Sequence, residues 1–176
     1  MSKTVDEHRA VSPGNLAFAI LTISTSRAQK KAAGSAFNDP SGDTITDLLE
    51  KNGQKVVFRR IVADDKTSID ALLKNTLSNR DVDVIITCGG TGITASDVTI
   101  ETIKPLLTKT LPGFGELMRK VSYEEIGSAA MLTRALAGTI GRKAVFCIPG
   151  SPQAVVTALK LIIPEVGHIM KHVRED

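Results

Sequence analysis

Val82 to Thr99 read Val-Asp-Val-Ile-Ile-Thr-Cys-Gly-Gly-Thr-Gly-Ile-Thr-Ala-Ser-Asp-Val-Thr, an apolar strand followed by a glycine-rich loop and an acidic helix start. Glycine exposes backbone N–H groups without a Cβ, and the start of the next helix adds unpaired N–H groups and the positive end of its dipole. The segment therefore predicts a strand–loop–helix unit that binds an anion, with phosphate as the expected ligand.

Two nucleotide-binding motifs fit this loop poorly. The residues after Gly92 are Ile-Thr-Ala-Ser, so no lysine reaches a terminal phosphate, which argues against a Walker-type NTPase. Gly90-x-Gly92-x-x-Ala95 formally fits the dinucleotide fingerprint, which belongs in a first strand–helix unit with an acidic residue about 20 residues later. Here the loop follows the third predicted strand, and the next acidic candidate, Glu116, follows Leu111-Pro112-Gly113. A nicotinamide enzyme is the weaker interpretation.

Length and composition indicate one domain and are compatible with small anionic ligands. A chain of 176 residues can bury roughly 70% of its unfolded surface in one core. The net charge is +3, the pI is about 8.9 and aromatic residues make up 3% of the chain. So few aromatic side chains offer little surface for stacking bases, and we expect no nucleic-acid partner. A few basic residues around a cleft suffice to attract phosphates.

The cysteines and the apolar runs indicate a cytoplasmic protein without a membrane segment. Cys88 and Cys147 each end an apolar run without metal-ligand spacing, which predicts reduced, buried thiols. The longest apolar run, Leu16 to Ile23, is too short to cross a bilayer, and residues 1–15 lack the apolar core of a secretory signal. We expect a flexible tail over residues 1–15 and a single domain over residues 16–173.

Strand and helix patterns alternate along the chain, which is typical of an α/β fold with a parallel sheet covered on both faces. Strands are predicted at 16–24, 56–62, 82–87 and 144–148. Helices are predicted after Ser41-Gly42-Asp43 up to Asn52-Gly53, at 67–78, from about 97 towards 107, and from Pro152 onward, and the tail at 164–173 is expected to be helical. Residues 111–137 are expected to be mostly helical. Residues 25–40 are rich in small and charged residues and are expected to form a mobile loop.

Polar loops are predicted to meet at one edge of the sheet, because open α/β sheets bind ligands outside the carboxyl ends of their strands. These loops contain Thr25-Ser26-Arg27, Asp64-Asp65, Gly89 to Thr94 with Asp97, and Pro149-Gly150-Ser151. Two of them can cradle phosphate and two carry carboxylates. This combination suits a magnesium-bound nucleotide, since Mg²⁺ takes one or two carboxylates together with phosphate oxygens.

Each of these residues also has a simpler structural explanation. Asp97 is a good helix N-cap, Asp64 or Asp65 could cap the helix at 67–78, and Ser151 could cap the helix that begins with Pro152. Arg27, Lys30 and Lys31 could form a solvated loop surface. The functional interpretation depends on their convergence at one edge.

The histidines point to the type of chemistry. His8, His168 and His172 lie near the termini, away from the predicted edge, which argues against a histidine triad or a histidine-rich metal site there. The reaction must then need no strong base. Phosphoryl or nucleotidyl transfer to an anionic nucleophile meets this condition, because catalysis is then positioning and charge neutralisation.

A set of motifs gives the chain a specific resemblance from Leu16 to Val173. The motifs are Ser41-Gly42-Asp43, Ile61-Val62-Ala63-Asp64-Asp65, Thr87-Cys88-Gly89-Gly90-Thr91-Gly92, Asp97-Val98-Thr99, Pro112-Gly113-Phe114-Gly115-Glu116, Arg134-Ala135 and Pro149-Gly150-Ser151-Pro152. With them the chain resembles the MogA/MoaB family of molybdenum-cofactor biosynthesis proteins, which includes the gephyrin G domain. The resemblance implies a three-layer α/β/α fold.

The resemblance also implies an activity and a site. The activity is adenylylation of molybdopterin, in which the terminal phosphate of the pterin attacks the α-phosphate of MgATP and releases pyrophosphate. Asp64 and Asp97 match the two functional carboxylates and would hold Mg²⁺. Glu116 matches an acidic position at the margin of the site. The residues expected to bind pterin or nucleotide are Ser26, Thr87, Gly89, Gly90, Thr91, Gly92, Thr94, Glu116, Pro149, Gly150 and Ser151.

Thr25-Ser26-Arg27 departs from the Asp-Arg of MogA-type members and is closer to the MoaB branch. Some relatives in that branch lack the first aspartate, which leaves a non-catalytic pterin carrier or assembly protein as the alternative; this chain keeps both aspartates. Family members form trimers and hexamers, and Ala129 to Leu136 is richer in small residues than a solvent-facing helix requires. The resemblance therefore implies a homotrimer or homohexamer, and hand-over of the product to a molybdenum-insertion protein.

Overall fold

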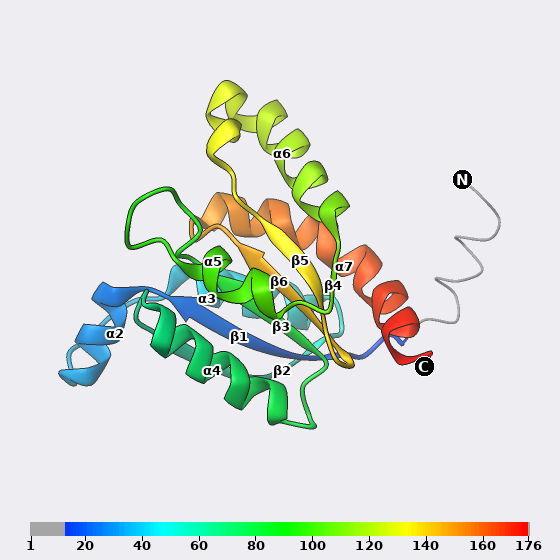
Figure 1. Cartoon of the computed structure of the whole chain (residues 1–176), viewed down its shortest axis with the longest axis horizontal. Helices are drawn as coiled ribbons and strands as arrows, with labels where there is room; N and C mark the ends of the chain where they lie inside the picture. The colour runs from blue at the N-terminus through cyan, green and yellow to red at the C-terminus, as the bar shows by residue number, and fades with distance from the viewer. Residues whose placement is uncertain (1–12, 176) are drawn as a thin grey trace.

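A six-stranded sheet forms the centre of the fold, with the strand order β2-β1-β3-β6-β5-β4 (Figure 1). The computed structural model describes residues 13–175. The parallel strands are β1 (Ala17–Ile23), β2 (Lys55–Val62), β3 (Val84–Cys88) and β6 (Lys143–Ile148). Two antiparallel strands, β5 (Leu136–Ile140) and β4 (Lys109–Thr110), extend one edge. The mostly parallel sheet expected from the sequence is confirmed.

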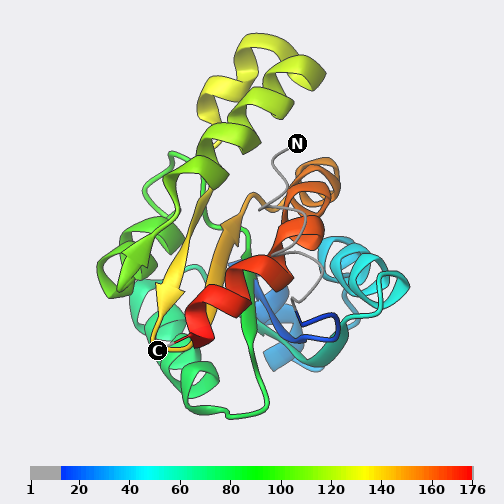
Figure 2. The same ribbon diagram turned by 90° about the vertical axis from the view of Figure 1, so that its right-hand side faces the viewer.

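Helices cover both faces of this sheet (Figure 2). One face packs against α3 (Pro40–Lys51), α7 (Pro152–Arg174) and the first half of α6 (Pro112–Ile126). The other packs against α4 (Lys66–Ser78) and the short α5 (Thr99–Ile103). Side chains alternate between the two cores along β3, where Ile86 faces the first and Ile85 the second. The three-layer α/β/α architecture is therefore confirmed.

All the described strands join one sheet. The single domain over residues 16–173 stays a prediction. The flexible tail predicted for residues 1–15 falls mainly outside the described residues. Both cysteines are buried and free, as expected. Burial raises the pKa of each thiol to about 12, so neither is a reactive thiolate at neutral pH.

The glycine-rich loop lies where the direction of the chain connections reverses. β1 has β2 on one side and β3 on the other, so the loops that leave the carboxyl ends of β1 and β3 diverge. Open α/β sheets bind ligands in the crevice that this reversal creates. Gly89 occupies this point, because a Cβ on it would stand 2.3 Å from the carbonyl oxygen of Ile23 at the end of β1.

The mobile loop predicted for residues 25–40 is wrong in its first half, where α2 (Thr25–Ala32) forms. Ser24 caps this helix by accepting a hydrogen bond from the N–H of Arg27, and Lys30 and Lys31 lie in its last turn, where the helix dipole favours cations. None of its residues is buried. The apolar periodicity that identifies the other helices is therefore missing from it.

Three further predictions are corrected in the second half of the chain. The helix expected over 97–107 is only α5 followed by a 3₁₀ turn, η1 (Lys104–Leu106), which contains Pro105. The mostly helical stretch over 111–137 contains α6 and the 3₁₀ helix η2 (Gly127–Leu132), but it ends in β5. That strand and β4 were not predicted, because one has a central glycine and the other has two residues. The helix expected from Pro152 and the helical tail expected at 164–173 form one continuous helix, with Pro164 inside it.

Among residues 13–175, α7 is the one helix with the length and apolar composition to cross a membrane. Its buried residues Val155, Leu159, Ile162 and Val166 recur at helical spacing and belong to the core on one face of the sheet. Packing against the sheet therefore accounts for its apolar composition.

Candidate active site

A cavity of about 390 Å³ lies at the carboxyl edge of the sheet. Three segments line it: Gly89 to Gly92 with Asp97, Pro149 to Ser151 with the first turn of α7, and the end of α6 with η2. The glycine loop and the loop after β6 were predicted to meet, and they do. The N–H of Gly89 donates to the carbonyl oxygen of Ile148 at 3.1 Å, and a Cβ on Gly150 would stand 3.2 Å from the Cα of Gly89.

Two glycines in the loop are required by the backbone itself. Gly89 has a φ of 106° and Gly90 a φ of 61°, in the region that side chains other than glycine disfavour. The loop is fixed to α5, since the Thr99 hydroxyl donates to the carbonyl of Gly89 and the Thr99 N–H to the carbonyl of Gly90, both at 2.9 Å. The loop is therefore held in one conformation before any ligand arrives.

The two predicted carboxylates lie against successive glycines of this loop. A Cβ on Gly90 would stand 2.6 Å from both carboxylate oxygens of Asp64, and a Cβ on Gly92 would stand 2.6 Å from Oδ2 of Asp97. Asp64 comes from the loop after β2, and it accepts a hydrogen bond of 3.4 Å from the N–H of Val98, the residue next to Asp97. Two separate segments thus bring both carboxylates to one loop, although Asp64 lies just outside the cavity lining.

Asp97 does not cap a helix, contrary to the simpler interpretation. The cap position of α5 is Val98, whose side chain makes no cap bond. Instead Asp97 Oδ2 accepts from the N–H of Thr94 at 2.9 Å and from its hydroxyl at 2.6 Å, which closes the turn after Gly92. Thr94 therefore contributes as the partner of Asp97. The alternative prediction of a cap was correct for Asp65, which caps α4 by accepting from the N–H of Ser68 at 2.8 Å.

The helix start after the glycine loop was predicted to present unpaired N–H groups to phosphate, and two of the N–H groups there are already occupied. The N–H of Val98 is directed to Asp64 and that of Thr99 to the carbonyl of Gly90, so both are used within the protein. The first turn of α7 also borders the cavity, because Ser151, Gln153 and Ala154 all line it. Ser151 is confirmed as its N-cap and accepts from the N–H of Ala154 at 3.3 Å.

The environments of the two carboxylates differ. The pKa of Asp64 is raised, mainly by partial burial. The hydrogen bond from Val98 lowers it, and the nearby charges of Asp97 and Asp65 raise it. The hydrogen bond from Thr94 lowers the pKa of Asp97, with a smaller contribution from the charge of Arg134. Among residues 13–175 no lysine or arginine forms an ion pair with Asp64. A partly desolvated carboxylate beside a second one suits a cation ligand.

This pair fits Mg²⁺ as a donor set. No three His, Cys, Asp or Glu side chains of the described chain converge in a metal-binding arrangement. An all-protein cage is therefore absent from this part of the molecule. Mg²⁺ does not need one, since it is typically bound through one or two carboxylates together with substrate phosphates and water.

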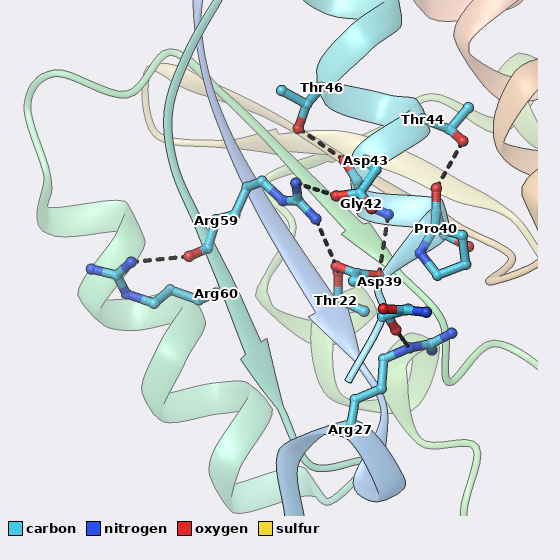
Figure 3. A network of polar contacts seen from close by, with 12 residues as sticks. Thr22, Arg27, Asp39, Pro40, Gly42, Asp43, Thr44, Thr46, Arg59 and Arg60 are labelled. Carbon is cyan, nitrogen blue, oxygen red and sulfur yellow. Dashed lines mark hydrogen bonds and ion pairs between the residues drawn. The ribbon is translucent and has the colours of Figure 1, made fainter. Parts of the chain in front are cut away.

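A buried network supports the site from α3, and Figure 3 shows its side chains. Asp39 accepts from the Thr22 hydroxyl at 2.8 Å, from the N–H of Gly42 at 3.2 Å and from Arg59 at 3.1 Å. Burial disfavours the charged form of Arg59, but hydrogen bonds to Asp43 and Asp39 outweigh it and raise its pKa. A Cβ on Gly42 would stand 2.2 Å from Asp39 Oδ2, so the network requires glycine at this position.

The Ser41-Gly42-Asp43 motif therefore has a structural role that reaches the cavity. The Ser41 hydroxyl donates to the carbonyl of Gly150 at 2.7 Å and is almost fully buried. This bond connects the start of α3 to the loop between β6 and α7. Sequence reasoning used Ser41 only as part of a motif and did not connect it to Gly150, because the two lie 109 positions apart.

The wall formed by α6 and η2 was not predicted. It contributes Ser122, Glu125 and Ile126 from α6, and Leu132 and Thr133 from η2 and the residue after it. The Thr157 hydroxyl of α7 donates to Glu125 at 2.9 Å, which ties the two helices together. The spacing of Ser122, Glu125 and Ile126 is that of one helix face, and this signal could have been found in the sequence.

Besides Thr94, which contacts Asp97, three residues predicted to bind pterin or nucleotide do not line this cavity. Glu116 is exposed near the start of α6, nine positions before Glu125, and does not line the cavity. Ser26 lines a separate hollow of about 470 Å³ with Arg27, Lys30 and Phe37. Thr87 is fully buried in β3; its hydroxyl lies beside the Cys147 thiol, and no described residue gives it a hydrogen bond of standard geometry. Their site roles stay predictions.

The chain matches one known family along most of its length. The family described as "Probable molybdopterin binding domain" matches residues 19–168. The chain belongs to this family. The resemblance that the sequence motifs carry is therefore confirmed, and the loops that line the cavity all fall inside the matched residues.

Named relatives of this molybdopterin-binding family are similar over their whole length. The Bacillus cereus "Molybdenum cofactor biosynthesis protein B" is 49% identical over 168 residues, which cover 94% of this chain and 95% of the relative. The Pyrococcus furiosus "Molybdopterin adenylyltransferase" is 45% identical and covers 97% of this chain and 99% of its own length. A crystal structure of a molybdenum cofactor biosynthesis protein B superposes with a TM-score of 0.85 at 47% identity, over 94% of this chain and 99% of that one.

Proposed function

We propose that this protein is a molybdopterin adenylyltransferase of molybdenum-cofactor biosynthesis. The observation that carries the proposal is the placement of Asp64 and Asp97 against Gly90 and Gly92, at the point of the sheet where nucleotides bind. A relative 45% identical in sequence bears the name of this activity. The reaction joins the terminal phosphate of molybdopterin to the α-phosphate of ATP. A bond forms between a pterin phosphate oxygen and the α-phosphorus, the bond to the β-phosphate bridge breaks, and pyrophosphate leaves.

The two substrates bind on different sides of the cavity. Gly89 to Gly92 present backbone to the nucleotide phosphates, and the first turn of α7 with Ser151 holds the pterin phosphate. The nucleophile is already an anion, so the site needs no general base. The protein accordingly contributes positioning and charge neutralisation, which supply most of the catalysis of such transfers.

Asp64 and Asp97 would hold Mg²⁺, which when bound offsets negative charge on the phosphate oxygens of ATP. Asp97 is oriented by its two hydrogen bonds from Thr94, and Asp64 by the N–H of Val98. The two carboxylates are thus fixed before substrate binds. Removing either should weaken the charge stabilisation of the transition state more than the binding of the pterin.

A non-catalytic pterin carrier is the alternative function. Incubation with molybdopterin, MgATP and label in the α-phosphate separates the two, because a carrier binds the pterin but forms no labelled adenylate. Asp97→Asn should lower the rate of adenylate formation on the order of 100-fold, the loss of about 3 kcal/mol typical of a preorganised electrostatic group. Pterin binding should be retained. Parental turnover by Asp97→Asn across a magnesium titration would remove Asp97 from the mechanism.

The assembly and setting of the protein are part of this proposal. Large apolar side chains are exposed on α6 and η2, among them Tyr123 (64% exposed), Met131 (81%) and Leu132 (60%). These segments extend beyond the sheet in Figures 1 and 2. Such a surface suits contacts between subunits of a homotrimer or homohexamer. We further propose a cytoplasmic location and hand-over of the adenylylated pterin to a molybdenum-insertion protein.

A further inference from the structure

The cavity of the candidate active site lacks positive charge, although both proposed substrates are anions. Among the described residues its lining contains the carboxylates of Asp97 and Glu125 and no lysine or arginine. In an adenylyl transfer, the oxygen that bridges the α- and β-phosphorus keeps the bonding electron pair, so negative charge grows on the departing pyrophosphate. One Mg²⁺ offsets only part of the charge of a triphosphate. The pyrophosphate part of the nucleotide therefore needs cationic side chains from outside this lining.

Helix α2 lies beside the glycine-rich loop. The chain leaves β1 at Ile23, whose carbonyl oxygen would stand 2.3 Å from a Cβ on Gly89, and α2 begins two residues later at Thr25. The Thr25 hydroxyl accepts a hydrogen bond of 3.0 Å from the N–H of Asp64. In Figure 1, α2 lies beyond the arrowhead of β1. The helix is therefore fixed next to the loop and to one of the two carboxylates proposed to hold Mg²⁺.

A hollow of about 470 Å³ with a basic lining lies along this helix. Arg27 and Lys30 line it together with Ser26 and residues 36–38, and none of these residues is acidic. Arg27 and Lys30 are three positions apart and so share one face of α2. Neither forms an ion pair with a residue of the described chain. Arg27 donates through Nε to the carbonyl of Asn38 at 2.9 Å, which fixes its guanidinium at the wall of the hollow (Figure 3).

The charge of Arg27 acts on the end of β3, from which the glycine loop leaves. Burial raises the pKa of the Cys88 thiol most, the charge of Asp39 raises it further, and the charge of Arg27 opposes both. Cys88 immediately precedes Gly89 in the chain. The guanidinium is therefore within electrostatic range of the loop that presents backbone to the nucleotide phosphates.

The composition of α2 also favours a bound anion. The helix has three basic residues and no acidic one, and Arg27 and Lys31 lie one turn apart, where like charges repel. A polyphosphate in the hollow would offset this repulsion. We propose that Arg27 and Lys30 bind the β- and γ-phosphates of the nucleotide and then the pyrophosphate that leaves, an inference that rests on the proposed adenylyl transfer.

Calorimetric titration of the full chain with sodium pyrophosphate, in the presence of magnesium chloride, tests this subsite without molybdopterin. The parental chain should bind pyrophosphate. Arg27→Gln and Lys30→Gln should each weaken that binding about tenfold or more, the loss expected when a charge-assisted hydrogen bond is removed. Arg27→Lys should keep more affinity than Arg27→Gln, because it retains the charge but loses the planar pair of donors. AMP has neither outer phosphate, so its affinity should be the same in the parent and these variants.

Lys31→Gln is the matched control. It removes an equal charge from the next position of α2, but Lys31 lines a different hollow, together with Asp43 and Arg59. Its pyrophosphate affinity should stay close to that of the parent. Four results would overturn the inference: a parental chain that binds no pyrophosphate, equal affinity in the parent, Arg27→Gln and Lys30→Gln, an equal loss in Lys31→Gln, or an equal loss of AMP affinity.

The titration also separates this subsite from the proposed activity. Weakened pyrophosphate binding in Arg27→Gln and Lys30→Gln, in a protein that forms no labelled adenylate, would support the phosphate subsite and refute the adenylyltransferase. Adenylate formation by the parent, with unaltered pyrophosphate binding in the two variants, would support the enzyme and leave α2 as a solvated surface, which overturns the inference.

Discussion

Gly90→Ala should damage the site through its backbone, and Gly53→Ala provides a matched control. Both glycines adopt a positive φ, 61° and 73°, so alanine costs about 1–2 kcal/mol at either position. Both changes also restrict the unfolded chain equally, which cancels in the comparison. A Cβ on Gly53 meets nothing within 4 Å. Gly53→Ala should therefore lose stability only through its backbone conformation.

At Gly90 the new Cβ would stand 2.3 Å from the Thr99 hydroxyl and 2.6 Å from the Asp64 carboxylate oxygens. Thr99 must turn away, and the buried carbonyl of Gly89 then loses its hydrogen bond, at a cost of about 1–3 kcal/mol. In urea titration, the free energy of unfolding of Gly90→Ala should thus be about 2–5 kcal/mol lower than that of the parent.

The same displacement moves Asp64, so the rate of adenylate formation should fall in Gly90→Ala and stay at the parental level in Gly53→Ala. Urea unfolding and the α-phosphate assay on both variants measure the two effects separately. Equal losses of stability in the two variants would refute the packing of Gly90 against Thr99. Parental activity in a destabilised Gly90→Ala would refute the role assigned to Asp64.

Three further outcomes are expected. Ser151→Ala should lose about 1 kcal/mol of folding stability because the cap of α7 is removed, and it should also bind the pterin more weakly. Ser24→Ala, which removes the cap of α2, should lose only stability. Unchanged pterin binding in Ser151→Ala would leave Ser151 as a cap alone. The raised pKa of Asp64 means that its ionised form is disfavoured in the folded state, so Asp64→Asn should be at least as stable as the parent at pH 7. Its advantage should shrink as pH falls through the raised pKa towards the ordinary value of about 3.9; a less stable variant at pH 7 contradicts this sign. Light scattering should show a trimer or hexamer, and a concentration-independent monomer contradicts the assembly.

The sequence by itself determined the parallel part of the sheet, because the apolar runs that form β1, β2, β3 and β6 are local patterns. It also predicted the loop at Gly89 to Gly92 and the cap at Ser151, since glycine and a serine before proline act on their own neighbours. Helix α2 was missed because the prediction depended on local apolar patterns. It buries no residue, so local apolar periodicity gives no signal for it.

Only the tertiary structure decided which residues from distant segments contact one another. Asp97 fits the sequence signature of a cap, yet it closes the turn at Thr94, because α5 begins two residues later than expected. Ser41 reaches Gly150 across 109 positions, and Glu125 rather than Glu116 lines the cavity. Such pairings depend on how α3, α6 and α7 pack around the sheet. Local propensity carries no information about that packing, which is set by the burial of side chains distant in sequence.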